Sequence, residues 1–295
     1  MKLDMKKGIA DLVQTLTFNK MLPIWMSNFA RNIQLILNGR DIKELERMDK
    51  EPCIVVGAGP SINYFRQLDT LKKWKGNVIA CDRMLIPLLK KGIKPKIVCS
   101  VDADEGVSNF YAGSLVKENK EGVKAVMSAT SIHPKVVQKC PLQIYFFVPI
   151  WDDPLKPTSL TRAFYFMVKK TMMETYGNAG SCAWAIAHFL GCDPIGILGL
   201  DYAYYTNDIK ETTYFQTFKT LSGRGTNKIL SYYRRVRTWA GYEVLTDVMW
   251  LTYLQLFLPA LSRAKSTTYN LSPLSIITNE RVKGMNLEEF IRRFG

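Results

Sequence analysis

The chain begins with a long stretch whose apolar residues recur at helical spacing. Trp25, Phe29, Ile33 and Ile36 follow one another at intervals of four, four and three residues, which places them on one face of a helix. Residues 1–50 therefore predict a helical arm. We expect it to pack on the body of the protein or on a second copy in a homo-oligomer. An interfacial membrane helix is the alternative, which the few basic residues on its polar side disfavour.

From residue 52 the pattern changes to short apolar runs that alternate with amphipathic stretches. This alternation is typical of β-α units around a parallel sheet, and right-handed crossovers make the sheet doubly wound. The expected strands are Cys53–Val56, Val78–Cys81, Ile97–Val101, Ala125–Ser128, Ile144–Val148 and Ile195–Leu200. The expected crossover helices are Ile62–Lys73, Leu85–Lys91, Pro134–Lys139 and Ser181–Leu190. The fold class is thus α/β, with a mainly parallel sheet in residues 51–205.

Residues 206–295 predict a basic, lid-like segment and C-terminal helices that complete the domain. The stretch 202–241 is rich in Tyr, Thr, Lys and Arg without clear periodicity, which is typical of a functional lid or a mobile loop. Two helices are expected after it, at Val244–Arg263 and Asn286–Arg293.

Composition narrows the class of protein. Hydrophobic residues make up 47% of the 295 residues, which is too apolar for a disordered chain. The amino terminus has no secretory signal, and the apolar stretch Val248–Leu261 is too short and interrupted for a span of about 20 residues. The six cysteines form no Cys-x-x-Cys pair, so we expect reduced core thiols and no zinc site. These features favour a soluble, cytoplasmic protein without a transmembrane segment.

The net charge of +14 admits several anionic partners without choosing among them. They include nucleic acid, an anionic membrane and a phosphorylated substrate.

The first candidate site is a glycine turn directly after the first expected strand, where a parallel sheet binds ligands. Its backbone N–H groups and the following helix dipole can meet a phosphate. The Ser61 hydroxyl either caps the helix or donates to that phosphate. Ile62 stands at the third glycine position of the dinucleotide fingerprint, so a nucleotide phosphate fits better than NAD. The turn consists of Gly57, Ala58, Gly59, Pro60 and Ser61.

Carboxylates follow the next two strands. Asp102 and Asp104 end the third strand with one residue between them, so both side chains point the same way. Beside a phosphate they suit Mg²⁺ or Mn²⁺; the alternative is a pair of turn or helix-capping residues. Asp82 lies 25 residues after Gly57, and an acidic residue about 20 residues after such a turn can contact a ribose hydroxyl. A salt bridge with Arg83 is the alternative for Asp82.

A second small-residue turn precedes the helix that begins near residue 181. It holds either an anionic or hydroxylated group or only the helix cap. Its candidate residues are Gly177, Asn178, Gly180 and Ser181.

Three further candidates lie elsewhere along the chain. His133 follows the fourth strand and is a candidate for acid-base chemistry or phosphate contact. Asp201 follows the sixth strand and is a candidate base. Arg234 and Arg235 belong to the basic stretch Arg224–Arg237. That stretch either neutralises a departing phosphate, contacts nucleic acid, or is a solvated basic face.

Several of these segments together resemble the MptE-like family. That family includes archaeal 6-hydroxymethyl-7,8-dihydropterin diphosphokinases and bacterial motility accessory factors that look like glycosyltransferases. The resemblance spans about residues 52–295 and leaves the helical arm outside. Its segments are VVGAGPS (55–61), ACDR (80–83), LLKKGIKPKIV (88–98), SVDAD (100–104), GNAGS (177–181), LGCDPI (190–195), GLDYAY (199–204), YNLS (269–272) and LEEF (287–290).

The resemblance implies a Rossmann-like fold, a nucleotide-activated donor and transfer chemistry. The Gly-x-Gly-Pro-Ser turn also resembles the nucleotide-binding turn of bacterial sialyltransferases, which use CMP-sugars. The amino-terminal arm and the long basic region after Asp201 favour the glycosyltransferase branch over the compact pterin kinases.

The leading hypothesis is a transferase that moves a sugar, such as a nonulosonic acid, from a CMP-sugar or another nucleotide sugar to an acceptor hydroxyl. The glycine turn would hold donor phosphate, Asp82 the nucleoside, and Asp102 with Asp104 a divalent metal or the reacting centre. The general base stays open among Asp201, Asp104 and His133. The acceptor stays open among a protein, a glycan and a nucleic acid.

Two rival functions remain. One is an Mg²⁺-dependent 6-hydroxymethyl-7,8-dihydropterin diphosphokinase that uses ATP. The other is a non-catalytic protein that binds nucleotides or nucleic acid.

Overall fold

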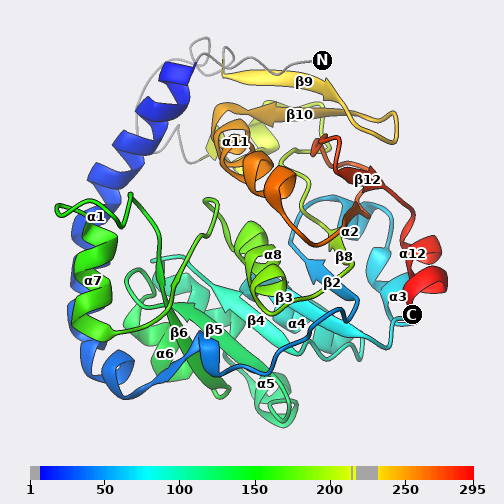
Figure 1. Cartoon of the computed structure of the whole chain (residues 1–295). Coiled ribbons are helices and arrows are strands. Elements are labelled where there is room, and N and C mark those ends of the chain that lie inside the picture. The colour runs from blue at the N-terminus through cyan, green and yellow to red at the C-terminus, as the bar shows by residue number, and fades with distance from the viewer. Residues whose placement is uncertain (1–6, 214, 217–231) are drawn as a thin grey trace.

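A computed structural model describes residues 7–213, 215–216 and 232–295, and its centre is a parallel sheet (Figure 1). Within these residues the sheet has the strand order β1-β6-β5-β4-β3-β2-β8-β11-β12, with β7 paired to β6. The strands are β1 (Arg40–Asp41), β2 (Cys53–Val56), β3 (Asn77–Cys81), β4 (Ile97–Ser100), β5 (Lys124–Ser128), β6 (Gln143–Pro149), β7 (Met172–Met173), β8 (Ile195–Leu198), β11 (Thr268–Asn270) and β12 (Val282–Gly284). The expected α/β fold with a mainly parallel, doubly wound sheet is confirmed.

The chain reverses its direction of travel across the sheet between β2 and β8. Strands β2, β3, β4, β5 and β6 follow one another in the sheet in the order of the sequence. Strand β8 then pairs with the other side of β2. Val55 of β2 lies between Ile79 of β3 and Ile197 of β8. In parallel sheets, ligands bind at such a reversal, beyond the carboxyl ends of the strands.

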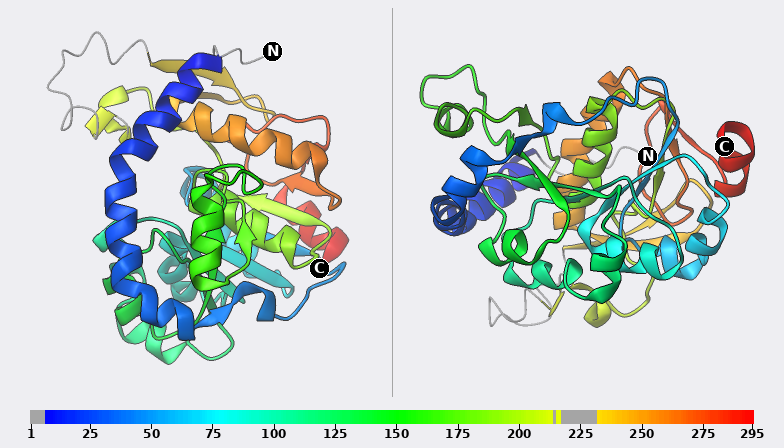
Figure 2. Two further views of the ribbon diagram at one scale, coloured as in Figure 1. Left: turned by 60° about the vertical axis from the view of Figure 1, so that its left-hand side comes forward. Right: turned by 90° about the horizontal axis from the view of Figure 1, so that it is seen from below.

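Helices cover both faces of the sheet, as the right-hand view of Figure 2 shows. Side chains alternate along each strand, so Val55 packs with α8 and α11 whereas Val56 packs on the opposite face. The helices are α1 (Lys7–Asn38), α2 (Ser61–Tyr64), α3 (Gln67–Leu71), α4 (Leu85–Lys90), α5 (Ser114–Glu118), α6 (Pro134–Lys139), α7 (Leu160–Val168), α8 (Ala179–Phe189), α11 (Val248–Arg263) and α12 (Leu287–Phe294). Short 3₁₀ helices are η1 (Ile42–Glu44), η2 (Asp82–Met84), η3 (Glu105–Phe110) and η4 (Ile209–Glu211).

The amino-terminal arm packs on the body of the protein. Phe29 and Ile36 of α1 are buried in the core on one face of the sheet. Asn28 Nδ2 donates to the carbonyl oxygens of Ala103 (3.3 Å) and Ser131 (2.9 Å). These bonds hold α1 against the carboxyl ends of β4 and β5, so the expected packing on the body is confirmed. A homo-oligomer through the arm stays a prediction.

The predicted helix Ile62–Lys73 is wrong as a single element. Arg66 adopts a left-handed conformation with φ of 50°, and the chain forms α2 and α3 on either side of it. A continuous helix cannot pass through such a residue.

The predicted helix Val244–Arg263 starts too early. Residues Glu243–Asp247 form β10, which pairs antiparallel with β9 (Tyr233–Arg237). Asp247 Oδ1 accepts hydrogen bonds from Met249 N (2.8 Å) and Trp250 N (2.9 Å), so α11 begins only after this cap. We call the β9–β10 pair the arginine ribbon.

The region 206–295 also contributes to the central sheet, which the sequence did not predict. Strand β11 pairs with β8, and β12 pairs with β11. None of the helices in the described residues combines the length and apolarity of a membrane span.

The turns after β2 and β8 touch each other through glycines. A Cβ on Gly57 would lie 2.5 Å from the Gly199 carbonyl oxygen, and a Cβ on Gly199 would overlap the Gly57 carbonyl oxygen. Gly199 also has a φ of 72°, which L-residues with a side chain rarely adopt. Backbone contact at this point therefore requires glycine.

We expect Gly199→Ala to lower the free energy of unfolding by at least about 2 kcal/mol more than Gly92→Ala. Gly92 shares the φ of 72° but has no heavy atom within 4 Å of its would-be Cβ, so it is a matched control for backbone strain. Urea denaturation followed by circular dichroism measures both losses. Equal losses would show that the close approach of the two turns contributes nothing beyond strain.

Candidate functional site

The two turns at the sheet reversal are joined by a buried carboxylate. Asp201 Oδ2 accepts a hydrogen bond from Ser61 N (2.7 Å), and Asp201 Oδ1 accepts one from Ser61 Oγ (2.8 Å). A Cβ on Gly59 would lie 2.5 Å from Asp201 Oδ2. The glycine turn thus closes around a carboxylate of the chain itself. We call this pair of hydrogen bonds the Asp201–Ser61 clamp.

The clamp limits what the turn can offer to a phosphate. Gly57 N donates to Leu198 O (2.7 Å) and Gly59 N donates to Gly199 O (2.8 Å). Ser61 is fully buried, and its hydroxyl and amide both meet Asp201. Ala58 is exposed, with Gly59 and Pro60 half-buried beside it. Ala58 is therefore the accessible part of the turn, whereas Ser61 serves the clamp.

Burial determines the chemistry of Asp201. Its side chain is 2% exposed, and desolvation raises its pKa to about 6 although Ser61 opposes the shift. A group this deep, with both oxygens engaged, contacts the turn rather than a substrate. The geometry therefore gives Asp201 a positioning role and disfavours it as the general base.

Asp82 belongs to a second buried network. It is 6% exposed; its Oδ2 accepts from Ser100 Oγ and its Oδ1 from Arg83 N, both at 2.7 Å. The Ser100 hydroxyl also lies 2.8 Å from the Tyr111 hydroxyl. Burial raises the pKa of Asp82 to about 6, and the charge of Asp102 adds to this effect. The geometry favours an internal role over ribose contact, while the Arg83 side chain is exposed.

Asp102 and Asp104 are both exposed at the carboxyl end of β4. Asp104 Oδ1 accepts from Gly106 N (2.6 Å) and so caps η3, and Asp102 Oδ1 accepts from Asp104 N (3.2 Å). Tyr253 of α11 lies near Asp102: burial raises the pKa of Tyr253, and the charge of Asp102 raises it further. Asp102 is thus an exposed carboxylate just beyond the carboxyl end of β4, while Asp104 also serves as a cap.

The two aspartates suit a metal only in part. In the residues that the structure describes, no three His, Cys, Asp or Glu side chains gather as a metal site. Each aspartate keeps one carboxylate oxygen outside the turn hydrogen bonds given above. Mg²⁺ commonly uses one or two carboxylates together with water and substrate phosphates, so this pair fits a metal that arrives with a nucleotide.

The second small-residue turn is a helix cap. Asn178 Oδ1 accepts from Gly180 N (2.9 Å) and Ser181 N (3.0 Å), and Asn178 Nδ2 donates to the Tyr202 hydroxyl (3.2 Å). The Ser181 hydroxyl donates to Thr175 O (2.8 Å). These polar groups stabilise the start of α8, so they are not directed at a ligand.

Gly177, in the same turn, meets the Tyr253 ring of α11. It is exposed and has a φ of 90°, and the Tyr253 ring occupies the place that a Cβ would take. Any side chain at this position would push the ring away. The turn after β7 and helix α11 therefore meet at Gly177 and Tyr253.

His133 caps α6. Its Nδ1 accepts from Lys135 N (3.2 Å), so the neutral ring carries its proton on Nε2. Nε2 is then a donor, which fits phosphate contact better than proton abstraction. The half-buried ring keeps His133 as a candidate at this edge of the sheet.

Arg234 and Arg235 lie on the arginine ribbon and do not follow the carboxyl end of a strand of the central sheet. Arg235 Nη1 donates to Glu243 Oε1 (3.0 Å), and Arg234 Nη1 donates to Tyr233 O (2.7 Å). Both line a pocket of about 390 Å³ on the ribbon. Of the other basic residues in the stretch Arg224–Arg237, Arg237 ends β9, whereas Arg224 and Lys228 lie outside the described residues.

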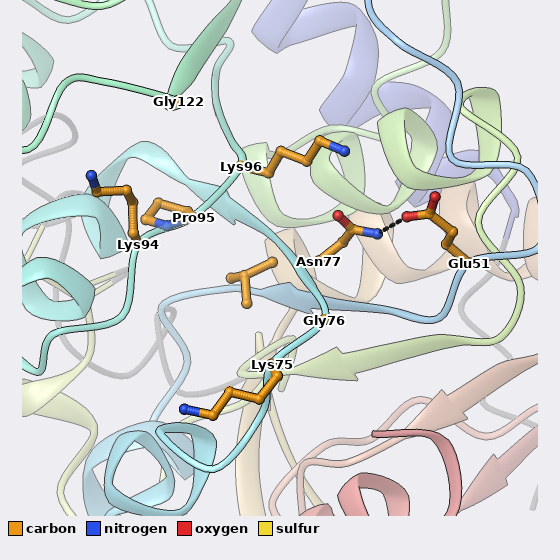
Figure 3. A pocket seen from close by; sticks show the side chains of 9 residues that line it. Glu51, Lys75, Gly76, Asn77, Lys94, Pro95, Lys96 and Gly122 are labelled. Atoms are coloured by element: carbon orange, nitrogen blue, oxygen red, sulfur yellow. Dashed lines mark hydrogen bonds between the residues drawn. The ribbon is translucent and has the colours of Figure 1, made fainter.

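A different pocket, of about 340 Å³, lies at the amino ends of β3 and β4 (Figure 3). Lys75, Lys94 and Lys96 line it, and Asn77 Nδ2 donates to Glu51 Oε2 (2.6 Å). It lies at the opposite edge of the sheet from the candidate residues, which follow the carboxyl ends of the strands. This pocket is therefore separate from the candidate site.

The sequence did not single out Tyr64, Tyr205 and Tyr253. Tyr64 and Tyr205 come shortly after the two turns, which is a local signal that could have found them. Tyr253 follows no turn or strand end, and only the packing of α11 brings it to Gly177 and Asp102.

Comparisons with known proteins agree with this architecture. The family model described as 6-hydroxymethylpterin diphosphokinase MptE-like matches residues 27–207, which are 181 of the 295 residues. The match includes residues 27–38 of α1, which the sequence resemblance left outside, and it does not reach residues 269–290. No curated protein matches the chain.

Among solved structures, the chain is similar in fold to the MAf glycosyltransferase from Magnetospirillum magneticum AMB-1. The TM-score is 0.62 and the sequence identity is 14%. The similarity covers 89% of this chain and 38% of that protein, so this chain spans well under half of its length.

We expect Asp201→Ala to lower the free energy of unfolding by about 3 kcal/mol, because it leaves the amide and hydroxyl of Ser61 buried without their acceptor. Asp104→Ala is the control, since it removes an exposed capping carboxylate and should cost about 1 kcal/mol or less. Urea denaturation measures both. Similar losses would contradict a central role for the clamp.

The raised pKa of Asp201 also predicts a pH dependence. A group whose pKa is higher in the folded than in the unfolded state adds stability as the pH falls. For Asp201 the window lies between about 6 and the ordinary value of 3.8. The unfolding free energy of the wild type, measured against Asp201→Asn, should rise by about 1 kcal/mol per pH unit as the pH falls through this window. Asp82 titrates in both proteins and cancels, so a constant difference would contradict the raised pKa of Asp201.

Proposed function

Because the chain belongs to the MptE-like family, we propose that it is a nucleotide-dependent transferase and, within that class, a glycosyltransferase. It moves a sugar from a nucleotide-activated donor to an acceptor hydroxyl. The observation that carries the proposal is the exposed pair Asp102 and Asp104, at the carboxyl edge of the sheet, on the second strand from β2, where the sheet reverses. This is where a doubly wound fold binds and transforms a nucleotide.

The extent of the fold similarity supports the glycosyltransferase branch. It covers 89% of the chain, whereas the family match covers residues 27–207. It therefore includes regions outside the family match. Those regions lie in the arm and after residue 207, where the sequence already favoured a glycosyltransferase.

In the proposed reaction the acceptor hydroxyl oxygen forms a bond to the anomeric carbon of the donor sugar. The bond between that carbon and the donor phosphate oxygen breaks, and the nucleotide leaves with the electron pair. The hydroxyl proton passes to a carboxylate. Asp102 is the best candidate to accept it, since it is exposed beyond the carboxyl end of β4, whereas Asp201 is buried in the clamp.

The departing phosphate needs hydrogen-bond donors and positive charge. Ala58 is the exposed residue of the glycine turn, and His133 presents a donor at Nε2. Arg234 and Arg235 supply guanidinium groups when the arginine ribbon meets the donor.

A divalent ion, Mg²⁺ or Mn²⁺, is compatible with the outer oxygens of Asp102 and Asp104. When bound with the nucleotide it supplies positive charge to the phosphate. Metal binding and proton acceptance compete for the same carboxylate oxygens, so measurements with and without Mg²⁺ separate these roles. The site of action we expect is the cytoplasm, and the acceptor is a protein, a glycan or a nucleic acid.

The second candidate function is ATP-dependent diphosphate transfer to a pterin alcohol. The description of the matched family, 6-hydroxymethylpterin diphosphokinase MptE-like, favours it. It uses the same carboxylates and phosphate contacts, but it requires a surface for a flat heterocycle.

We expect a cytidine or uridine nucleotide to stabilise the protein in a thermal-shift screen of CMP, UDP and ATP, each with and without Mg²⁺. Hydrolysis of the matching nucleotide sugar should fall about a hundredfold in Asp102→Asn, because that variant lacks the proposed proton acceptor. Asp153→Asn is the matched control: Asp153 is also exposed, and its Oδ1 accepts from Leu155 N (3.0 Å) in another loop.

Three results would overturn parts of this proposal. ATP-dependent turnover of the pterin alcohol would replace the glycosyltransferase with the diphosphokinase. Unchanged hydrolysis in Asp102→Asn would remove Asp102 from the reaction. Salt-dependent binding of nucleic acid without turnover of any donor would make the protein a binding module.

A further inference from the structure

Four aromatic rings gather beside the sheet reversal, on three separate elements. Tyr64 ends α2 and Phe65 follows it, Tyr205 lies in the loop after β8, and Tyr242 precedes β10. The ring centroids of Tyr64 and Tyr205 are 4.4 Å apart at an interplanar angle of 70°. Phe65 lies 4.9 Å from Tyr64 and 5.3 Å from Tyr242. The four rings form one continuous edge-to-face cluster.

Two of these rings face solvent and two support them. Tyr64 is 54% exposed and Tyr205 is 38% exposed, although burying such rings would be favourable. Phe65 and Tyr242 are half-buried and pack against the main core. The exposed pair therefore stands on a fixed base, and a tyrosine ring has only two side-chain torsions left to order.

The clamp fixes where this pair lies. Tyr64 comes three residues after Ser61, and Tyr205 comes four residues after Asp201. Since Ser61 and Asp201 are hydrogen-bonded to each other, the two tyrosines are anchored to the same point. The Tyr205 hydroxyl also donates to the Tyr64 hydroxyl (3.3 Å). The pair is thus pre-formed, and Tyr64 follows the exposed Ala58 by six residues in the chain.

We propose that Tyr64 and Tyr205 form a stacking platform for the planar base of a nucleotide whose phosphate lies at the Ala58 side of the glycine turn. An exposed tyrosine face binds any base through its π surface, and the hydroxyl groups offer hydrogen bonds to the base edge. The platform rests on the proposed function, because it takes the donor nucleotide as its ligand. It accounts for two large exposed rings at the reversal of the sheet.

The test is isothermal titration calorimetry on the full chain with the tightest binder among CMP, UDP and ATP. The double variant Tyr64→Ala/Tyr205→Ala should weaken binding about tenfold or more. Tyr64→Phe/Tyr205→Phe keeps both rings and should stay within about threefold of the wild type. Phe166→Ala is the control, because Phe166 is 54% exposed on α7 and should leave binding unchanged.

Ribose 5-phosphate separates base stacking from a general change of the site, since it has a phosphate and no base. Its affinity should be the same in the wild type and in the alanine double variant. An equal loss for ribose 5-phosphate and the nucleotide would overturn the platform, and so would full nucleotide affinity in the alanine variant. The proposed function fails by a different result, namely a wild-type protein that binds none of the three nucleotides.

Discussion

The close contact between the turns after β2 and β8, fastened by the Asp201–Ser61 clamp, is the constraint on which the rest of the site depends. It requires glycine at positions 57, 59 and 199, because a Cβ at any of them meets the opposite turn. It also requires a buried carboxylate, whose desolvation is offset by hydrogen bonds from the amide and hydroxyl of Ser61. Through chain connectivity the clamp then fixes Ala58, Tyr64 and Tyr205 around the reversal of the sheet.

The clamp occupies the position at which a glycine turn commonly binds an anionic ligand. A Gly-x-Gly turn before a helix is commonly an anion site, and here the anion at the helix start is Asp201. The surface left for a nucleotide is the exposed side of the turn and the carboxylate edge at Asp102. The function that we propose thus depends on groups beside the turn more than on the groups inside it.

Local patterns predicted much of the fold. The apolar runs gave β2 without error and five more strands to within two residues, because a buried parallel strand is a continuous apolar segment. The break at Arg66 was missed because a single left-handed residue does not change the apolar periodicity. Strand β10 was missed because its pairing with β9 leaves no periodic signal in the sequence. Strand β11 was missed because its three residues are too few to stand out.

The site was harder to predict, because a polar side chain before a helix can either cap that helix or bind a ligand. Asp104, Asn178 and His133 all cap helices here, and the same side chains in the same positions would suit a ligand. The clamp joins residues 140 positions apart, and Tyr253 reaches Gly177 only through the packing of α11. A crystal structure of the protein with its tightest-binding nucleotide and Mg²⁺ tests the account most directly. We predict density with the phosphate beside Ala58 and the clamp intact; a nucleotide bound in the lysine-lined pocket at the amino ends of β3 and β4 would contradict it.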